Sequence, residues 1–289
     1  MNAAKALRHW VIEREAVRVR KESGAPAPWT DDPIIAKYRF CNVRREDDAV
    51  TVWISKNIRE PYADHPQLWF MLAISRWINW PDTLADMIDV GVWPSEDDFD
   101  PREMAELLHA RADRGEKVFT GAYTINAPAT KGASKIDYVA HCVLGDVWVN
   151  DRLHDLLRAG VPQPTLRAVH MALRQFQGWG AFMAYQVVVD LRFTRYLRDA
   201  EDVSTWAAAG PGTVRGLNRI ASRRTNYPLD QSQALHELRT LYKTIREETG
   251  VDMDFSDVPN ILCETDKYCR VMNNEGAPRA LYHPAVQAA

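Results

Sequence analysis

The sequence lacks the patterns that mark several common classes of protein. Its four cysteines include no C-x-x-C pair and its eight histidines no H-E-x-x-H pattern, so neither a zinc site nor a disulfide framework is predicted. No apolar run is long enough to span a bilayer, and residues 1–24 are too highly charged for a secretory signal peptide. We therefore expect a cytoplasmic protein with no metal, no cofactor and no membrane partner.

The sequence also lacks an excess of positive charge and a nucleotide-binding loop. The formal net charge is −3, whereas a dedicated non-specific DNA-binding protein is usually basic. Any contact with DNA must therefore rest on local positive charge. The pattern G-x-x-x-x-G-K-[ST] is absent, so the sequence does not predict a P-loop kinase.

Helical signals dominate what is present. Asp100-Pro101 predicts the start of a helix and Gly115 its end, and Gly250 and Gly160 are further stop signals. Further helices are expected at residues 1–23, 134–158, 165–177, 180–191, 204–209 and 232–248. Strand signals are weak and confined to 49–55 and 118–125. We expect a mainly α-helical chain.

Positive charge is concentrated in two stretches that contain no acidic residue, 156–189 and 203–229. In the second stretch Arg215, Arg219 and Arg223 are spaced by four, which predicts one arginine face on a helix. Such a face is a candidate for contacts with DNA phosphates. The alternative is an ordinary surface helix whose charges pair with acids elsewhere in the chain.

A glycine turn, Gly178-Trp179-Gly180, lies between two apolar helical segments at about 165–191. This arrangement resembles the helix-hairpin-helix of DNA glycosylases, in which backbone N–H groups at the start of the second helix bind a phosphate. The resemblance makes Asp202 the candidate for the glycosylases' catalytic Asp and Asp190 an earlier one, although an Asp before a helix is more often a cap.

A second candidate segment is FCNVRREDD, followed by a short apolar run. Arg39, Arg44 and Arg45 are candidates to clamp a phosphate, and Asp47 or Asp48 could accept a proton. Composition alone favours a surface turn of salt-linked side chains.

The FCNVRREDD segment also carries a resemblance. It is similar to the signature of a bacteriophage family described as glutamyl/putrescinyl-thymine pyrophosphorylases and as amino acid:DNA transferases, related to the helical domain of 5-hydroxymethyluracil DNA kinases. The blocks FTGAY, GWGAFMAYQVVVDLR, GPGTVRGLNR and LCETDKY match in the same order. The resemblance implies one catalytic unit over residues 1–289, with a two-lobed, helix-hairpin-helix, DNA-glycosylase-like fold.

The family's activity implies the substrates and the cellular setting. The enzyme would replace the phosphate of 5-phosphomethyl-deoxyuridine in double-stranded DNA with the nitrogen of an amino acid or amine, in an infected bacterial host. The base would be flipped out of the helix. Arg44 and Arg45 would neutralise the leaving phosphate, and Asp47 or Asp202 would accept the amine's proton. Cys41 is a candidate nucleophile at uracil C6, although a buried inert thiol is the more common role.

The remaining candidates concern substrate binding. Arg39, Asn42, Glu264 and Lys267 could bind the amino acid or a phosphate, although a salt bridge explains Glu264 and Lys267 equally well. Tyr123 and Trp179 could stack on the flipped base, with core packing as the alternative for Tyr123. Two rival functions stay open: a true DNA glycosylase, and a non-catalytic helical DNA-binding partner of the kinase.

Overall fold

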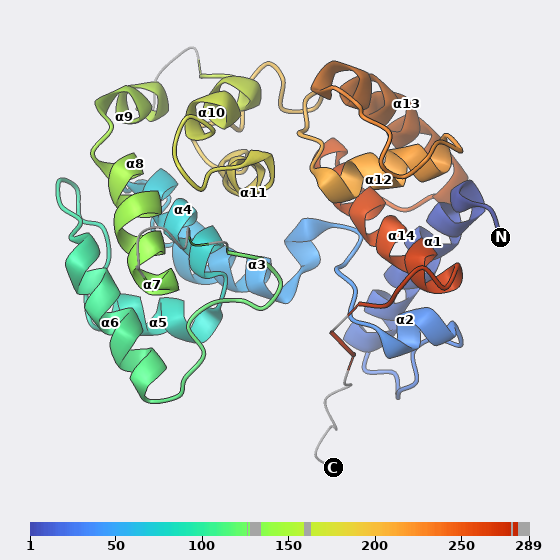
Figure 1. The fold of residues 1–289 in the computed structure, drawn as a ribbon, viewed down its shortest axis with the longest axis horizontal. Helices are drawn as coiled ribbons and strands as arrows, with labels where there is room; N and C mark the ends of the chain where they lie inside the picture. Colours follow the sequence, from blue (N-terminus) through green and yellow to red (C-terminus); the bar gives the residue numbers. More distant parts are fainter. Residues whose placement is uncertain (126, 128–133, 159–162, 279, 283–289) are drawn as a thin grey trace. The chain divides into compact units, whose positions relative to one another are not determined.

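The computed structural model describes residues 1–125, 127, 134–158, 163–278 and 280–282. Within these residues the regular structure is helical, apart from an isolated bridge between Tyr38 and Leu281 (Figure 1). The prediction of a mainly helical chain is confirmed. The chain divides into two compact units, one of residues 1–48 and 204–289 and the other of residues 49–203. We call them unit 1 and unit 2.

Unit 1 is built from both terminal segments of the chain. Its elements are α1 (Ala3–Glu22), α2 (Pro33–Lys37), η1 (Arg45–Asp47), α12 (Pro211–Ile220), α13 (Gln231–Thr249), η5 (Phe255–Asp257) and α14 (Val258–Met272). Helix α14 is the centre of the unit, because α1 and α12 both pack against it (Figure 1). The buried rings of Trp10, Phe40 and Tyr268 lie near one another in this core, with centroid separations of 6.1 Å and 6.4 Å.

The ends of the unit 1 helices follow from the sequence signals. Asp230 and Gln233 form a reciprocal capping box at the start of α13. Gly250 ends the helix with φ of 65°, a left-handed conformation that glycine adopts without steric cost. The predicted helix and its glycine stop are confirmed.

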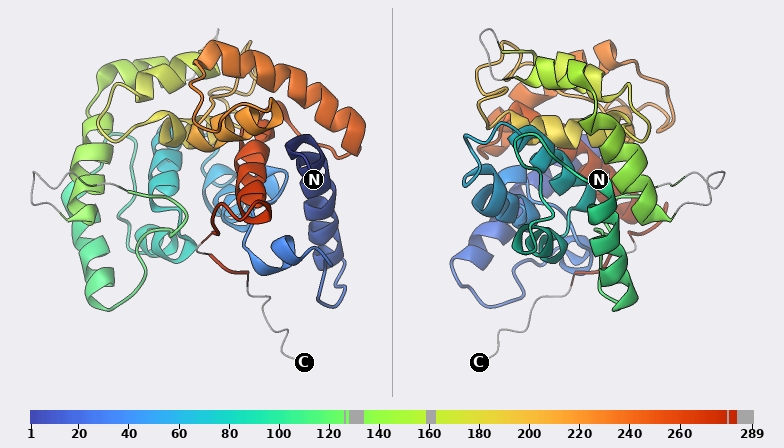
Figure 2. Two further views of the ribbon diagram at one scale, coloured as in Figure 1. Left: turned by 45° about the vertical axis from the view of Figure 1, so that its right-hand side comes forward. Right: turned by 90° about the vertical axis from the view of Figure 1, so that its left-hand side faces the viewer.

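Unit 2 is a bundle of short helices. Its elements are α3 (Ala49–Ile54), η2 (Ser55–Arg59), α4 (Leu68–Ile78), α5 (Pro81–Asp89), α6 (Pro101–Asp113), α7 (Lys135–Asp137), η4 (Tyr138–Gly145), α8 (Asp146–Trp148), α9 (Asp151–Leu157), α10 (Leu166–Leu173) and α11 (Ala181–Leu191). The segments η2 and η4 are π-helical. Both views in Figure 2 keep α6 beside η4, consistent with their packing.

The core of unit 2 is the packing of α4 against α11. Every residue of α4 is buried, including Arg76. The Arg76 guanidinium forms a bidentate ion pair with Asp190 on α11, at 2.5 Å and 2.6 Å. Because both side chains are almost fully buried, loss of either partner would leave an uncompensated charge and cost about 3–5 kcal/mol.

Three local expectations need correction or fall outside the structure. Residues 49–54 form helix α3 rather than a strand, because Thr51 and Ile54, three apart, are the buried side chains. Residues 118–125 form no strand either. Residues 204–209 are not helical, since the Ala209 backbone pairs with the Gln231 side chain at 3.0 Å and 2.9 Å. Gly160 lies outside the described residues.

Candidate functional site

The FCNVRREDD segment folds as a closed turn in unit 1. The Asn42 N–H donates to Asp48 Oδ1 at 2.8 Å, and the Asn42 amide donates to the Asp47 carbonyl at 2.6 Å. Arg44 donates from Nε and Nη2 to the two carboxylate oxygens of Asp47, each at 2.8 Å. Asn42 therefore has a structural task within the turn, and Asp47 fixes the orientation of Arg44.

Helix α14 brings the second predicted block, LCETDKY, to this turn. The Cys41 N–H donates to Glu264 Oε2 at 3.0 Å, and Glu264 also pairs with Lys267 at 2.6 Å. The Lys267 ammonium donates to the Arg39 carbonyl at 3.1 Å and lies over the Phe40 ring. The structure thus joins two segments that lie more than 200 residues apart in the sequence, and the Glu264–Lys267 salt bridge is present.

Arg45 and Asp257 form the inner side of the turn. The Arg45 N–H donates to Asp257 Oδ1 at 3.0 Å, and the Arg45 side chain is buried. Burial raises the pKa of Asp257 to about 6, although hydrogen bonds from the backbone of Arg45 and Asp254 oppose the shift. Asp257 was not among the predicted residues. Its position before helix α14 reads in the sequence as an ordinary cap.

Arg14 of α1 is a second residue that the sequence did not single out. Its Nε donates to the Cys41 carbonyl at 3.0 Å. Its Nη1 is buried and has no hydrogen-bond partner among the described residues. Burial lowers the pKa of Arg14, and the charge of Asp48 opposes that shift. A charged residue on a highly charged helix gives no sequence signal of this kind.

The titratable groups of the turn differ in their ionisation. Burial raises the pKa of Asp48 to about 6, against the effect of the Asn42 N–H and Arg45. Burial raises the pKa of the Cys41 thiol well above its ordinary value, and the charge of Glu264 adds to the shift. At neutral pH Cys41 is therefore a protonated thiol. Asp48 is ionised, and its pKa of about 6 makes it a stronger base than an ordinary carboxylate.

We call this set the turn cluster: Arg14, Cys41, Arg45, Asp48, Asp257, Glu264 and Lys267. It lies wholly within unit 1, and α1, the 38–48 segment, η5 and α14 supply its members.

The predicted arginine face is only partly a helical face. Arg215 and Arg219 lie on α12, but the helix ends at Ile220 and Ser222 has φ of 56°, so Arg223 leaves the helix. Arg215 and Arg219 both pair with Asp266 of α14, at 2.8 Å and 2.7 Å.

These arginines have acidic partners, which favours the surface-helix alternative. Arg219 also pairs with Glu275, and Arg223 forms a bidentate pair with Glu237 at 2.7 Å and 2.6 Å. The 203–229 stretch contains no acidic residue, but folding brings acidic partners to its arginines from α13, from α14 and from the residues after α14.

The block GPGTVRGLNR has a packing role that the sequence analysis missed. A Cβ at Gly216 would lie 2.5 Å from the Leu262 carbonyl oxygen, and one at Gly212 would overlap the Cys263 side chain. Glycine at both positions therefore lets α12 approach the backbone of α14 closely. The G-x-x-x-G spacing was the available signal.

The predicted helix-hairpin-helix segment forms two helices, α10 and α11, joined by the glycine turn. Gly178 has φ of 85°, and no side chain among the described residues caps α11 at Gly180. Trp179 is buried and donates from Nε1 to the Val143 carbonyl at 3.0 Å, a placement that favours packing over stacking on a base. Phe182 is 41% exposed.

Tyr123 lies beside this turn. Its ring meets the Phe182 ring edge-on at 5.2 Å, and its hydroxyl donates to Gln186 at 3.3 Å. Tyr123 is partly exposed, so neither stacking nor packing is decided by its position.

The two aspartates suggested by the glycosylase resemblance have structural partners. Asp202 accepts from the N–H groups of Leu166 and Arg167 at 2.7 Å and 3.0 Å, which caps the start of α10. Asp190 is held in the buried pair with Arg76. Both placements favour a structural role.

The chain matches the family model of the 5-hmdU DNA kinase helical domain over residues 1–277. It belongs to this family. It is also 25% identical over 283 residues to the 5-hmdU DNA kinase of Bacillus phage SP10. That match covers 89% of this chain and 43% of the kinase, so the chain spans less than half the length of this curated relative. No solved structure matches the chain.

Membership in the family of the kinase helical domain confirms the relationship expected from the ordered blocks. All five blocks contribute to the features above: two build the turn cluster, one packs α12 on α14, one forms the glycine turn, and FTGAY places Tyr123 beside that turn. In the part of the chain that the structure describes, no helix could cross a membrane, and no group of acidic, histidine or cysteine side chains could hold a metal ion.

Proposed function

We propose that this chain is a transferase of phage thymine hypermodification. It replaces the phosphate of 5-phosphomethyl-deoxyuridine in DNA with the nitrogen of an amino acid or amine. The C–O bond to the C5 methylene breaks, a C–N bond forms, and a carboxylate takes the amine's proton. The observation that carries the proposal is the turn cluster, because a module that only bound DNA would not need buried groups of opposite charge around a carboxylate with a shifted pKa.

Asp48 is the proposed proton acceptor. A general base works best when its pKa lies near the operating pH, and burial brings the pKa of Asp48 to about 6. Asp47 is less suited to this role because both of its oxygens accept from Arg44. Asp202 is less suited because it caps α10.

Arg44 is the proposed contact for the departing phosphate. Its side chain is 38% exposed, and the bond to Asp47 uses Nε and Nη2, which leaves Nη1, with only a 3.8 Å pair to the exposed Asp252, to contact the phosphate. Arg45 is buried and contributes charge from behind the turn. Arg39 is exposed near Lys267, and in the proposal these two cations bind the carboxylate of the amino acid, with Glu264 holding Lys267 in place.

Direct displacement is the proposed route. Attack by Cys41 at C6 would need a thiolate, and the raised pKa of this buried thiol keeps it protonated at neutral pH. The amine therefore attacks the C5 methylene without a covalent enzyme intermediate.

DNA recognition is assigned to the α10–α11 hairpin and to the arginines of the two acid-free stretches, 156–189 and 203–229. The proposal includes a single glycosylase-like catalytic unit with two lobes, a flipped base, and contact of α11 with a phosphate through Gly178 and Gly180. It places the protein in the cytoplasm of an infected bacterium, with double-stranded DNA and an amino acid as partners. The uncapped start of α11 and the exposed ring of Phe182 support this assignment.

The second candidate is a non-catalytic DNA-binding partner of a 5-hydroxymethyluracil kinase. The observation that favours it is the family match, which is to a kinase's helical domain. A true glycosylase is less favoured, since Asp202 and Asp190 both have structural partners.

Mass spectrometry of nucleosides tests all three functions at once. DNA containing phosphorylated 5-hydroxymethyluracil is incubated with the protein and a mixture of amino acids, then digested to nucleosides. A new N-linked nucleoside supports transfer, and its loss in Asp48→Asn supports the assigned base. Abasic sites would indicate a glycosylase, and unchanged DNA that still binds the protein would indicate the binding module.

A further inference from the structure

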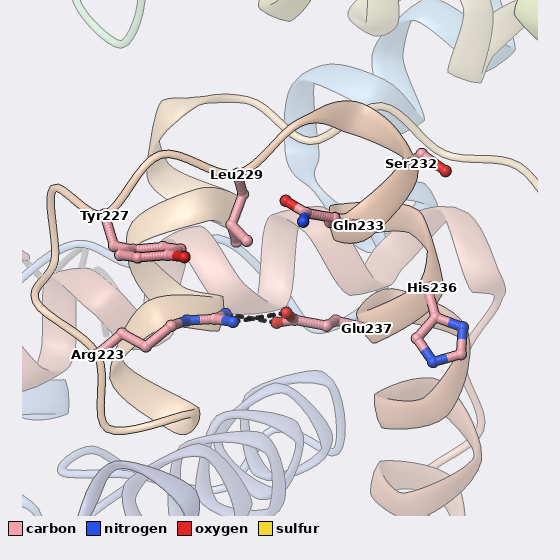
Figure 3. Close-up of a pocket in the computed structure, with 7 residues that line it drawn as sticks. All are labelled: Arg223, Tyr227, Leu229, Ser232, Gln233, His236 and Glu237. Atoms are coloured by element: carbon pink, nitrogen blue, oxygen red, sulfur yellow. Dashed lines mark hydrogen bonds and ion pairs between the residues drawn. The ribbon is translucent and has the colours of Figure 1, made fainter.

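A surface pocket lies in unit 1, apart from the residues of the turn cluster (Figure 3). It has a volume of about 430 Å³, within the range of small-molecule sites. One wall is the loop that follows α12, and the other is the first two turns of α13. The lining residues are Arg223, Tyr227, Leu229, Ser232, Gln233, His236 and Glu237.

The base of the pocket is electrically neutral. Arg223 donates from both terminal nitrogens to Glu237 at 2.7 Å and 2.6 Å, as the dashed lines of Figure 3 show. Because both terminal nitrogens of Arg223 are bound to Glu237, neither is left for a free phosphate or carboxylate. The pocket is therefore poorly suited to bind a strongly charged ligand.

The walls combine an aromatic face with neutral polar groups. Tyr227 is 46% exposed and its ring lies over the Arg223 guanidinium, 5.6 Å from centroid to Cζ. Leu229 adds apolar surface next to it (Figure 3). From α13 come the hydroxyl of Ser232, the amide NH2 of Gln233, whose oxygen is used in the capping box, and the imidazole of His236, which together supply both donors and acceptors of hydrogen bonds.

We propose that this pocket binds a nucleobase, with the ring stacked on Tyr227 and its polar edge facing Gln233 and His236. A planar, uncharged heterocycle with donors and acceptors around its rim matches both walls. Stacking of a base on an exposed aromatic side chain tolerates any sequence, because every base has a π-face. The pocket is thus a base-holding site outside the turn cluster.

Two sources could supply the base, a single-stranded stretch of DNA or a free nucleotide. Arg224, next to Arg223 in the chain, is exposed and forms no ion pair among the described residues. It is available to contact a phosphodiester. This site requires only that the protein binds nucleic acid or a nucleotide, and it does not depend on the proposed transfer reaction.

The test uses 2-aminopurine, whose fluorescence falls when the ring stacks on an aromatic side chain. The protein is titrated into a short single-stranded oligonucleotide containing 2-aminopurine, and separately into 2-aminopurine nucleotide. We expect quenching that is retained in Tyr227→Phe and lost in Tyr227→Leu, which keeps apolar bulk without a π-face. The Kd should rise by about 5-fold to about 150-fold, the range given by the stacking of one base.

Thr240→Ala provides the matched control, because Thr240 is exposed on the same helix row one turn beyond His236. It should leave the quenching unchanged. Quenching by the oligonucleotide assigns the site to a DNA strand, and equal quenching by the nucleotide assigns it to a free nucleotide. Absence of quenching, or quenching that Tyr227→Leu retains, overturns the proposal. Nucleoside mass spectrometry with the same variant reports separately on transfer.

Discussion

Cys41 and Glu264 lie 223 positions apart in the chain, and the N–H of Cys41 donates a 3.0 Å hydrogen bond to Glu264 Oε2. The same carboxylate oxygen pairs with Lys267 at 2.6 Å. One buried carboxylate therefore ties the 38–48 segment to helix α14 and holds a lysine at the edge of the turn.

Replacing Glu264 by alanine should lower the free energy of unfolding by about 1–3 kcal/mol, because it leaves a backbone N–H without its partner and a lysine without its counter-charge. Urea denaturation of both proteins gives the difference. Glu247→Ala is the control, since Glu247 is exposed on α13 and its loss should change the unfolding free energy little. Equal effects of the two substitutions would show that the Cys41–Glu264 link does not stabilise the unit.

Gly216→Ala should destabilise the protein more than any single change on the exposed face of α12. The added Cβ would meet the Leu262 carbonyl oxygen at 2.5 Å, and backbone cannot rotate away as a side chain can. We expect a loss of about 1–3 kcal/mol or more, measured by thermal unfolding. Gly180→Ala is the control, because a Cβ there meets nothing within 4 Å. A stable Gly216→Ala variant would contradict the close contact of α12 and α14.

Asp48 should contribute stability at low pH that is lost as the pH rises from about 4 to about 6. Burial raises the pKa of Asp48 from 3.8 to about 6, so in this window the unfolded chain has released the proton that the folded chain still holds. A shift of this size corresponds to something on the order of 3 kcal/mol. Asp257 is shifted in the same direction and adds to the effect.

Asp48→Asn should remove the part of this pH dependence that belongs to Asp48, and denaturation at several pH values measures it. Asp252→Asn is the control, because Asp252 is 80% exposed. If Asp48→Asn keeps the wild-type pH dependence, Asp48 is not the group that titrates.

Arg44→Ala should slow transfer while leaving DNA affinity nearly unchanged. Charge on the leaving phosphate is greatest as the C–O bond breaks, so its electrostatic partner matters most in the transition state. Loss of one such contact commonly costs on the order of a hundred-fold in rate. Arg44→Lys should restore only part of it, since a single ammonium cannot hold Asp47 through two nitrogens and offer a third to the phosphate.

Arg8→Ala is a matched control for Arg44, because both side chains are 38% exposed and both pair with an acid. Single-turnover rates and binding isotherms on the same phosphorylated DNA give the comparison. A wild-type rate in Arg44→Ala would remove Arg44 from the proposed site.

The salt dependence of DNA binding should report on Arg167 and Arg174 more than on the arginines of α12. Arg167 and Arg174 are exposed and form no ion pair among the described residues, whereas Arg215, Arg219 and Arg223 already have carboxylate partners. Each lost phosphate contact should reduce the slope of log K against log salt by about 0.9.

The double variant Arg167→Ala/Arg174→Ala should therefore flatten the slope more than the triple change at 215, 219 and 223. Arg114→Ala is the control, because Arg114 is exposed just after α6 and is paired with Glu116. A larger effect of the triple change would restore the α12 arginines as the main DNA contact.

The sequence by itself determined the helical class and the ends of α1, α6, α11 and α13 to within about two residues. Gly115, Gly178 and Gly250 adopt positive φ in the structure, and Asn2, Thr165 and Asp230 cap helices, because these are local properties of backbone and side chain. The ordered blocks also gave the family. The strand expected at 49–55 was wrong, because a short apolar run does not distinguish a strand from a helix that buries one face.

Only the tertiary structure decided which polar groups meet. Asp266 supplies the charge that the acid-free stretch at 203–229 lacks, and Asp257 and Arg14 join the turn cluster from distant segments. Trp179 and Asp202 have structural partners for the same reason. Contacts of this kind depend on groups that folding brings together from positions 27 to 212 residues apart in the chain. Ionisation follows from them, because the raised pKa of Asp48 and of Cys41 is caused by burial in the folded chain, a property that no local pattern carries.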